Sequence, residues 1–420
     1  MGHCSLNGPS WPPPLLAEVA PLDLESLVLV LAASSLGAVL SRLHRRVVLP
    51  TVVLEIVLGI LIGPEVLALA EVDSYVNFLA NLGLGFLFFF AGLEVVEKNV
   101  PRQSLVRGTL GWALSLALGL VLGAVLHNAG LDAEWWLLGL ALATTALGTL
   151  VPILGDAGIL PTPLGSAVLG TGVAGEFWPI VFISVFLTGT YGAVEEVLLL
   201  LAFGALVLLA ATAALRARPH GLVRVLQQTV HTTGQAAVRM SVLLLAALVL
   251  LAVEVGFDFV LGAFAAGLVV GLTLNSPQGE PVRMRLEGIG FGFLIPVYFV
   301  VTGMNFDLDS LLTPTGLGLA ALFLSLLVVV RGTSSLLWLR ELGTRKTLSL
   351  ALFGATGLPL IVAIVGIGTD NGAIAADVGT SLIGAGMISV LLFPLLAMTI
   401  AGRGTAAVAA PSASAEEGEY

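Results

Sequence analysis

Glu176 is the ionisable residue of this chain that lies deepest in an apolar stretch. It follows the glycine-rich sequence 170–175. At about 1.5 Å per helical residue, it lies roughly 20 Å into the apolar stretch 163–190. At such a depth desolvation favours the protonated carboxyl and a bound cation favours the ionised one, so a proton and a cation compete for one group. The alternative is a structural role, as a protonated carboxyl that forms a hydrogen bond to a neighbouring helix.

Three further ionisable residues interrupt apolar sequence. Arg331 directly follows the run 326–330. Its long side chain reaches the cytoplasmic surface, or it pairs with Glu176 when the site is empty and so limits the cost of a bare buried charge. Glu55 either caps a neighbouring broken helix or is structural. For Glu94, near an inner membrane boundary, we expect a structural role.

Two segments combine threonine and glycine with a following proline. Thr144 and Thr145 precede Pro152, and Thr356 precedes Pro359. Interrupted helices of this kind expose half-helix dipoles and backbone carbonyls, and the threonine hydroxyls add oxygen ligands for a cation. The alternative is a pair of proline-kinked packing helices. Because the two segments occupy matching positions in the two halves of the chain, we favour the interpretation as a binding site over that as packing helices.

The chain contains an internal repeat. The same spacing separates Gly92 from Gly303 as separates Thr145 from Thr356. We therefore expect two six-helix halves, residues 24–190 and 238–400, joined by a linker helix at 193–215. A single linker helix inverts the second half relative to the first, and proteins built in this way bind their substrates near the membrane midplane. The two interrupted segments then cross at that depth.

The composition places the chain in a membrane. Of its 420 residues, 57% are hydrophobic and only 10% are charged, and the mean hydropathy is +1.05. Apolar runs of about 20 residues cross the hydrocarbon core as helices. The sequence predicts an all-α polytopic membrane protein of about thirteen such helices, near 24–42, 48–66, 76–96, 105–127, 134–154, 163–190, 193–215, 238–254, 258–274, 288–306, 312–339, 346–369 and 377–400.

The basic residues fix the orientation. They collect in alternate loops, and the intervening loops hold acids without Lys or Arg. By the positive-inside rule the N-terminus is outside and the C-terminus inside a cell membrane that the chain crosses many times. We expect an external tail at 1–23, a membrane transport domain at 24–402 and a cytoplasmic tail at 403–420.

The sequence lacks the usual equipment of an enzyme. No His, Cys and carboxylate residues share the spacing of a metal site, and no phosphate-binding loop or nucleophile elbow occurs in its structural context. The basic loop 216–239 satisfies the topology without implying nucleic acid. We expect no catalysis, no cofactor, no resident metal and no nucleic-acid partner.

Several sequence stretches resemble one family of transporters. Residues 50–64, PTVVLEIVLGILIGP, are similar to the second-helix signature of the monovalent cation:proton antiporters of the second large antiporter family, which includes sodium/proton and potassium/proton exchangers. Further matches are FFFAGLE ending at Glu94, TPLG at 162–165, FVLGAFAAGLVVG from Phe259 and IPVYFVVTGM from Ile295. The resemblance implies a homodimer of thirteen-helix inverted-repeat subunits, in which a core domain moves against a dimerisation domain.

The resemblance also assigns roles to individual residues. The family has a pair of polar residues in the sixth helix, of which the second is the acid that binds the proton or cation. Glu176 matches that acid, and Gly175 departs from the pattern at the first position. Arg331 matches a basic residue of the eleventh helix that the family associates with a salt bridge to the acid.

These observations predict an antiporter that exchanges Na+ or K+ for protons by alternating access. Glu176 would alternate between its protonated and cation-bound states, with Thr144, Thr145 and Thr356 as further ligands. Because Arg331 retains its charge, we expect electroneutral one-for-one exchange. One alternative keeps the fold and changes the substrate, as a symporter or exchanger of a small organic solute. Another is a non-transporting membrane sensor. An intramembrane enzyme is the weakest alternative.

Overall fold

The computed structural model describes residues 24–43, 50–97, 100–186, 198, 201–209, 212, 235–274 and 279–401. Within these ranges every regular element is a helix, as the sequence predicts, and the only extended pairing is an isolated bridge between Ala133 and Ile374. The predicted tails at 1–23 and 403–420 lie outside the described residues. Their boundaries stay a prediction.

Each predicted span other than 193–215 corresponds to one helix or to a series of consecutive helices. Of 193–215 the structure describes residues 198, 201–209 and 212, all of them helical. Within the described ranges, eight helical stretches are long and apolar enough to cross a membrane, and three shorter apolar helical stretches accompany them. The helices are α1 (Leu24–Leu43), α2 (Thr51–Ile62), α3 (Ser74–Glu97), α4 (Arg102–Asn128), α5 (Trp135–Leu142), α6 (Leu147–Asp156), α7 (Pro163–Phe186), α10 (Ala236–Val255), α11 (Phe259–Leu274), α12 (Glu280–Ile289), η1 (Gly290–Leu294), α13 (Ile295–Met304), α14 (Leu308–Leu312), α15 (Pro314–Ser335), η2 (Leu336–Trp338), α16 (Leu339–Gly354), α17 (Pro359–Asp370) and α18 (Ala376–Ala401).

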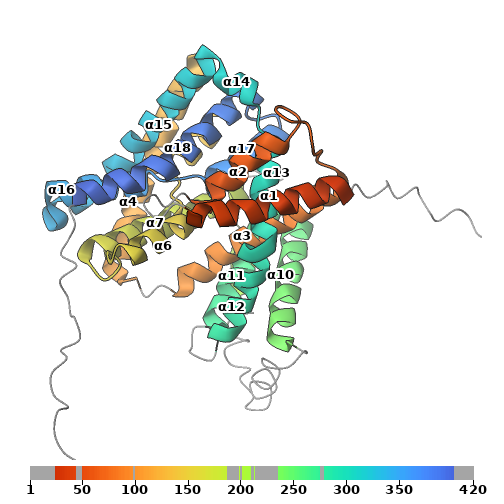
Figure 1. The fold of residues 1–420 in the computed structure, drawn as a ribbon. Coiled ribbons are helices and arrows are strands. Elements are labelled where there is room, and N and C mark those ends of the chain that lie inside the picture. Colours follow the sequence, from red (N-terminus) through yellow and green to blue (C-terminus); the bar gives the residue numbers. More distant parts are fainter. Residues whose placement is uncertain are drawn as a thin grey trace, which may run out of the picture.

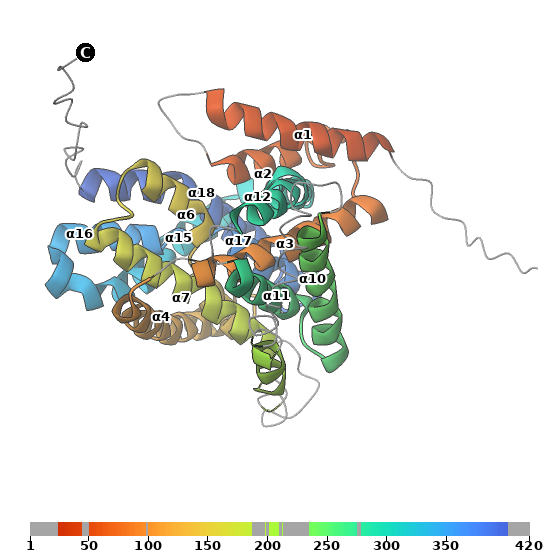
Figure 2. The ribbon, with the colours of Figure 1, turned by 90° about the horizontal axis from the view of Figure 1, so that it is seen from below.

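The described helices form two bundles. The α3 bundle contains α1, α2, α3, α10, α11, α12, η1 and α13, and the α7 bundle contains α4 to α7 and α14 to α18. Figures 1 and 2 show α15, α16 and α18 on one side of the molecule and α10 and α11 on the other. The bundles meet mainly where α7 contacts α3 and α11 and where α18 contacts α2.

Glycines allow close approach of the helices inside the α3 bundle. A Cβ atom on Gly59 of α2 would collide with the backbone of Val300 on α13, and one on Gly303 of α13 would collide with the backbone of Ile56. In a membrane, where apolar surface alone gives helices little reason to associate, such backbone contacts are a main source of packing energy. Gly303, one of the residues that indicate the internal repeat, therefore lies in a close contact between α2 and α13.

Two helices of the α7 bundle are broken in the middle. The first break, at residues 143–146, separates α5 from α6, and the second, at 355–358, separates α16 from α17. Pro359 lies at the start of α17, where its missing N–H removes no helical hydrogen bond. At their other ends the two broken helices are joined, since Glu134 N donates to Ala373 O at 2.8 Å and Ala375 N donates to Asp132 O at 2.9 Å.

Candidate functional site

The two breaks lie against each other, as expected for crossing broken helices. Ala146 N donates to Thr356 O at 2.8 Å. The hydroxyl of Thr145 donates to Gly354 O at 2.7 Å. Each break thus provides hydrogen-bond partners for backbone groups that the other break leaves without a helical partner. Irregular backbone persists at membrane depth in this way.

The three threonines of the breaks are fully buried. The hydroxyl of Thr144 donates to Ala141 O at 2.8 Å, and that of Thr356 donates to Leu352 O at 3.1 Å. Each of these hydroxyls, like that of Thr145, therefore directs its proton to a carbonyl and keeps lone pairs that accept a cation. Cation binding by these oxygens stays a prediction.

Glu176 lies on α7 and caps the first turn of α6. It is 9% exposed, and its Oε1 accepts from Leu147 N at 2.9 Å and from Gly148 N at 3.3 Å. The N-terminus of a helix has N–H groups without a hydrogen-bond partner in the helix, and it has a positive partial charge. Both stabilise a carboxylate. The helix start after the first break therefore supplies the hydrogen-bond donors and the positive partial charge that stabilise the buried carboxylate of Glu176.

Gly175 is glycine because two groups already fill the space beside it. A Cβ atom there would lie 2.7 Å from Thr145 Oγ1 and 3.1 Å from Arg331 Nη2. Thr145 N also donates to Gly175 O at 3.1 Å. The departure from the family's polar pair at this position thus has a steric basis in the structure.

Arg331 lies on α15 and is fully buried, which excludes the alternative in which its side chain reaches the cytoplasmic surface. Its Nε donates to Gly354 O at 3.2 Å and its Nη2 to Thr171 O on α7, also at 3.2 Å. Its Nη1 donates to Ser115 Oγ on α4 at 3.4 Å. The guanidinium therefore links α4, α7 and the end of α16; its ion pair with Glu176 stays a prediction.

Glu55 lies elsewhere. It is 3% exposed on α2 in the α3 bundle, and its Cγ would be 3.1 Å from a Cβ atom on Gly37 of α1. The described contact is thus with α1, and a supporting role for Glu55 at the breaks stays a prediction.

Glu94 is a residue whose position the sequence reasoning missed. Its Oε1 lies 3.9 Å from the point where a Cβ atom on Gly148 would lie, in the first turn of α6. The sequence signal that could have indicated this position is the place of Glu94 at the end of FFFAGLE, one of the stretches that resemble the antiporter family. Two acids, one from each bundle, therefore lie at the same helix start.

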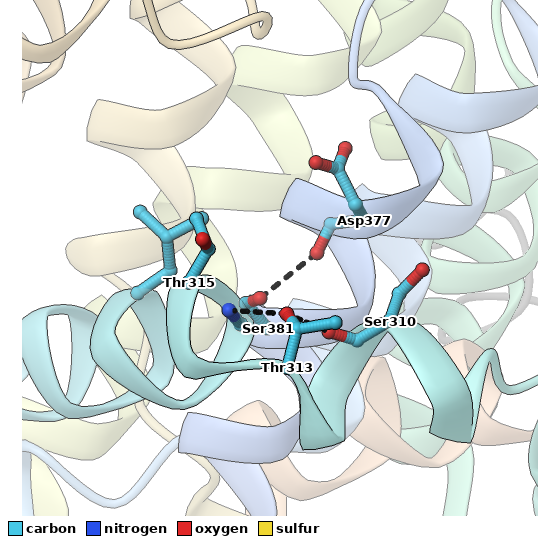
Figure 3. Close-up of a pocket in the computed structure, with 7 residues that line it drawn as sticks. Ser310, Thr313, Thr315, Asp377 and Ser381 are labelled. Atoms are coloured by element: carbon cyan, nitrogen blue, oxygen red, sulfur yellow. Dashed lines mark hydrogen bonds between the residues drawn. The ribbon is translucent and has the colours of Figure 1, made fainter.

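A separate small cavity of about 170 Å³ lies at the start of α15 and α18 (Figure 3). None of Glu176, Arg331 and the three threonines lines it. Its lining residues are Ser310, Thr313, Thr315, Gly316, Leu319, Asp377 and Ser381. In the described ranges no group of three or more His, Cys, Asp and Glu side chains has the arrangement of a metal site.

Comparison with known proteins gives one family model. The model described as "Sodium/hydrogen exchanger, transmembrane" matches residues 30–398. Among similar proteins, the putative Na(+)/H(+) antiporter YjbQ of Bacillus subtilis is 29% identical over 398 residues, which are 90% of this chain and 63% of that protein. This chain therefore spans less than two thirds of that relative's length.

Two further relatives match along nearly their whole length. The Na(+)/H(+)-K(+) antiporter GerN of Bacillus cereus is 26% identical over 386 residues, 88% of this chain and 93% of that protein. The structure of the sodium proton antiporter MjNhaP1 from Methanocaldococcus jannaschii superposes with a TM-score of 0.64 at 18% identity, covering 90% of this chain and 98% of that one. This likeness establishes the fold.

Proposed function

We propose, because the chain belongs to the sodium/hydrogen exchanger family, that it exchanges a monovalent cation for protons across a membrane. Relatives named as Na(+)/H(+) antiporters support Na+ as the cation, and the name of GerN supports K+ as well. The chain is a multi-pass membrane protein. We place it in the cell membrane as a homodimer, with its N-terminus outside and its C-terminus inside, and we assign it transport rather than catalysis.

The observation that supports exchange most directly is the cap that Glu176 forms on α6. The carboxyl oxygen of Glu176 accepts from two backbone N–H groups at a helix start, an arrangement that stabilises the charged form in a place where lipid and apolar side chains oppose it. A proton on Glu176 removes the charge that a cation needs. Occupation by one ion therefore excludes the other, which couples their movements.

The threonine oxygens complete the proposed cation site. Thr144, Thr145 and Thr356 come from the two breaks, which lie against each other and against α7. Neutral oxygens with free lone pairs together with one carboxylate suit a hard monovalent cation. Thr144, Thr145 and Thr356 bind the cation in this proposal, and Glu176 binds either the cation or the proton.

Arg331 keeps a positive charge inside the α7 bundle throughout the cycle. Its guanidinium holds Gly354 O and Thr171 O at 3.2 Å, so it moves with the helices that form the site. Because this charge stays fixed and Glu176 is the single acid that exchanges ions, one cation is exchanged for one proton. The exchange is then electroneutral.

Movement of one bundle against the other exposes the site to each side in turn. The bundles share few helix pairs. One of their contacts is the ring of Phe177, next to Glu176, with its centroid 5.6 Å from that of Phe264 on α11. Apolar contacts of this kind slide without leaving buried polar groups unpaired. The α7 bundle therefore moves while the α3 bundle forms the scaffold.

Purified protein in liposomes that hold an internal pH-sensitive dye tests the proposal. We expect external NaCl or KCl to drive proton efflux, choline chloride to have no effect, and an imposed membrane potential to leave the rate unchanged. Glu176→Gln should reduce the signal to that of protein-free liposomes, whereas Glu65→Gln, at an exposed acid beyond α2, should transport normally. Exchange by Glu176→Gln at the wild-type rate would contradict the proposal, and solute uptake without ion movement would favour a solute carrier instead.

A further inference from the structure

We infer that Glu94 is a second acid of the cation site, presented by the α3 bundle to the start of α6, and that it sets the affinity for the cytoplasmic cation. The inference rests on the proposed exchange function. It goes further by assigning to the scaffold bundle a residue that determines how strongly the site attracts its substrate.

The charges around Glu176 call for another acid. The start of α6 contributes a positive partial charge, equivalent to about half an elementary charge for a long helix, and two N–H donors to Glu176 Oε1. Arg331 adds a full positive charge, with Nη2 only 3.1 Å from the Cβ position of the neighbouring Gly175. One carboxylate therefore faces positive charge that is at least equal to its own. Additional negative charge would therefore strengthen the attraction of this site for a cation.

Glu94 supplies that charge from a suitable place. Its Oε1 lies 3.9 Å from the Cβ position of Gly148, and Gly148 N is itself a donor to Glu176. Apart from the helix's own backbone and its chain neighbours, Glu94 Oε1 is the one described heavy atom within 4 Å of that position. The first turn of α6 thus has an acid on either side, one on α7 and one on α3.

The two acids belong to different bundles. α3 packs on α11 and α13, whereas α6 packs on α7 and α18. When the bundles move relative to each other, Glu176 stays with α6 and Glu94 does not. The second acid is therefore present at the site in one conformation and withdrawn in another.

The orientation of α3 indicates which conformation this is. The basic loop after α3 places the end of that helix, and with it Glu94, on the cytoplasmic side. Glu94 is partly exposed there. Its carboxylate then attracts the cation that enters from the cytoplasm, and its withdrawal favours release on the other side.

Side-specific kinetics test the inference. Vesicles with the cytoplasmic face outward and vesicles of the opposite orientation are prepared with wild-type protein, Glu94→Gln, Glu94→Asp and Glu287→Gln. Glu287 is the matched control because it is an acid of the cytoplasmic helix α12 whose described partner is Arg283. The KM for Na+ and for K+ is measured on each face, with choline as the inert cation.

We expect Glu94→Gln to raise the KM of the transported cation about tenfold on the cytoplasmic face, the effect of losing one charge interaction of ordinary strength. The KM on the external face and the maximal rate should stay within about twofold of wild type, Glu94→Asp should be intermediate and Glu287→Gln normal. An unchanged KM on both faces would overturn the inference, as would a lower maximal rate with unchanged KM, which indicates a structural role.

A binding measurement separates this inference from the proposed function. Thermal stabilisation of the purified protein is titrated with NaCl, KCl and choline chloride. Glu94→Gln should need about tenfold more Na+ or K+ for the same stabilisation, and equal titrations of wild type and Glu94→Gln would overturn the inference. If wild-type vesicles exchange no ions, the proposed function fails, whereas the titration still tests Glu94.

Discussion

Arg331 Nη2 donates a hydrogen bond of 3.2 Å to the carbonyl oxygen of Thr171, on the same helix as Glu176. A buried guanidinium that binds backbone carbonyls of one helix and the end of another holds the frame around the acid in place. Arg331 is thus a structural element of the site, whatever its charge contributes to exchange.

Removing the guanidinium should destabilise the protein. Hydrogen bonds from a charged donor contribute about 1.5–3 kcal/mol each, and Arg331→Ala also leaves a cavity. Arg331→Lys keeps the charge but not the planar fork that spans α4, α7 and α16. We expect melting temperatures in the order wild type, Arg331→Lys, Arg331→Ala.

The partly exposed Arg107 provides the control for this series. It pairs with Glu341 at the surface, and surface pairs contribute about 0–1 kcal/mol. Arg107→Ala should therefore melt close to wild type. An Arg331→Ala protein that melts like Arg107→Ala would contradict the structural role.

Adding a methyl group at Gly175 should disturb the site. The new Cβ would lie 2.7 Å from Thr145 Oγ1 and 3.1 Å from Arg331 Nη2, and such overpacking costs about 1–3 kcal/mol. Gly175→Ala should lower both the melting temperature and the exchange rate. Gly366→Ala on α17 is the control, because nothing lies within 4 Å of its Cβ position; it should be neutral or slightly stabilising. Equal behaviour of the two variants would refute the steric argument.

The hydroxyl of Thr145 should matter more than its methyl group. Thr145→Ser retains the hydrogen bond to Gly354 O, observed at 2.7 Å, and the lone pairs proposed as cation ligands. Thr145→Val retains the shape and loses both. We expect Thr145→Val to raise the cation KM about tenfold, equivalent to roughly 1.4 kcal/mol, and Thr145→Ser to stay near wild type. Similar KM values for Val and Ser would argue against Thr145 as a ligand.

Asp258 should give the stability a measurable pH dependence. It lies between α10 and α11, where burial raises its pKa above the ordinary value and the hydrogen bond from Val260 N partly offsets this effect. An acid whose pKa is raised by folding binds protons more tightly in the folded state. Its contribution to stability therefore falls as the pH rises from the unfolded-state pKa to the folded-state pKa.

Asp258→Asn tests this relation because the amide oxygen still accepts from Val260 N, observed at 2.9 Å in the wild type. The variant should melt at a higher temperature than wild type at neutral pH, and this advantage should shrink as the pH falls toward 4. Melting curves across that range decide the point. A constant difference at all pH values would show that Asp258 does not titrate in the way described.

Much of the site was accessible from the sequence. Glu176 stood out because an acid deep in an apolar run has few explanations, and the breaks stood out because Thr, Gly and Pro together interrupt a helix. The fold followed from hydrophobic runs and from the distribution of basic residues. These signals lie within short segments of the chain, so a single sequence is enough to detect them.

The remaining features depend on contacts between distant segments. The described hydrogen bonds of Arg331 go to two carbonyls and a serine, and nothing in the sequence marks which carbonyls a break leaves open. The need for glycine at 175 arises from Thr145 and Arg331, which come from two other helices. The sequence predicts a structural role for Glu94, and the separation of Glu94 and Glu176 in the chain hides the fact that both lie near the first turn of α6.

The backbone bridge between Ala133 and Ile374 has a mechanical consequence. The broken helices are joined at their breaks, through Ala146 and Thr356, and again at one end. Two broken helices that are bonded to each other at two points cannot pivot independently. In the proposed exchange cycle, an ion bound where the two breaks meet would therefore move together with both broken helices and would not pass from one helix to the other.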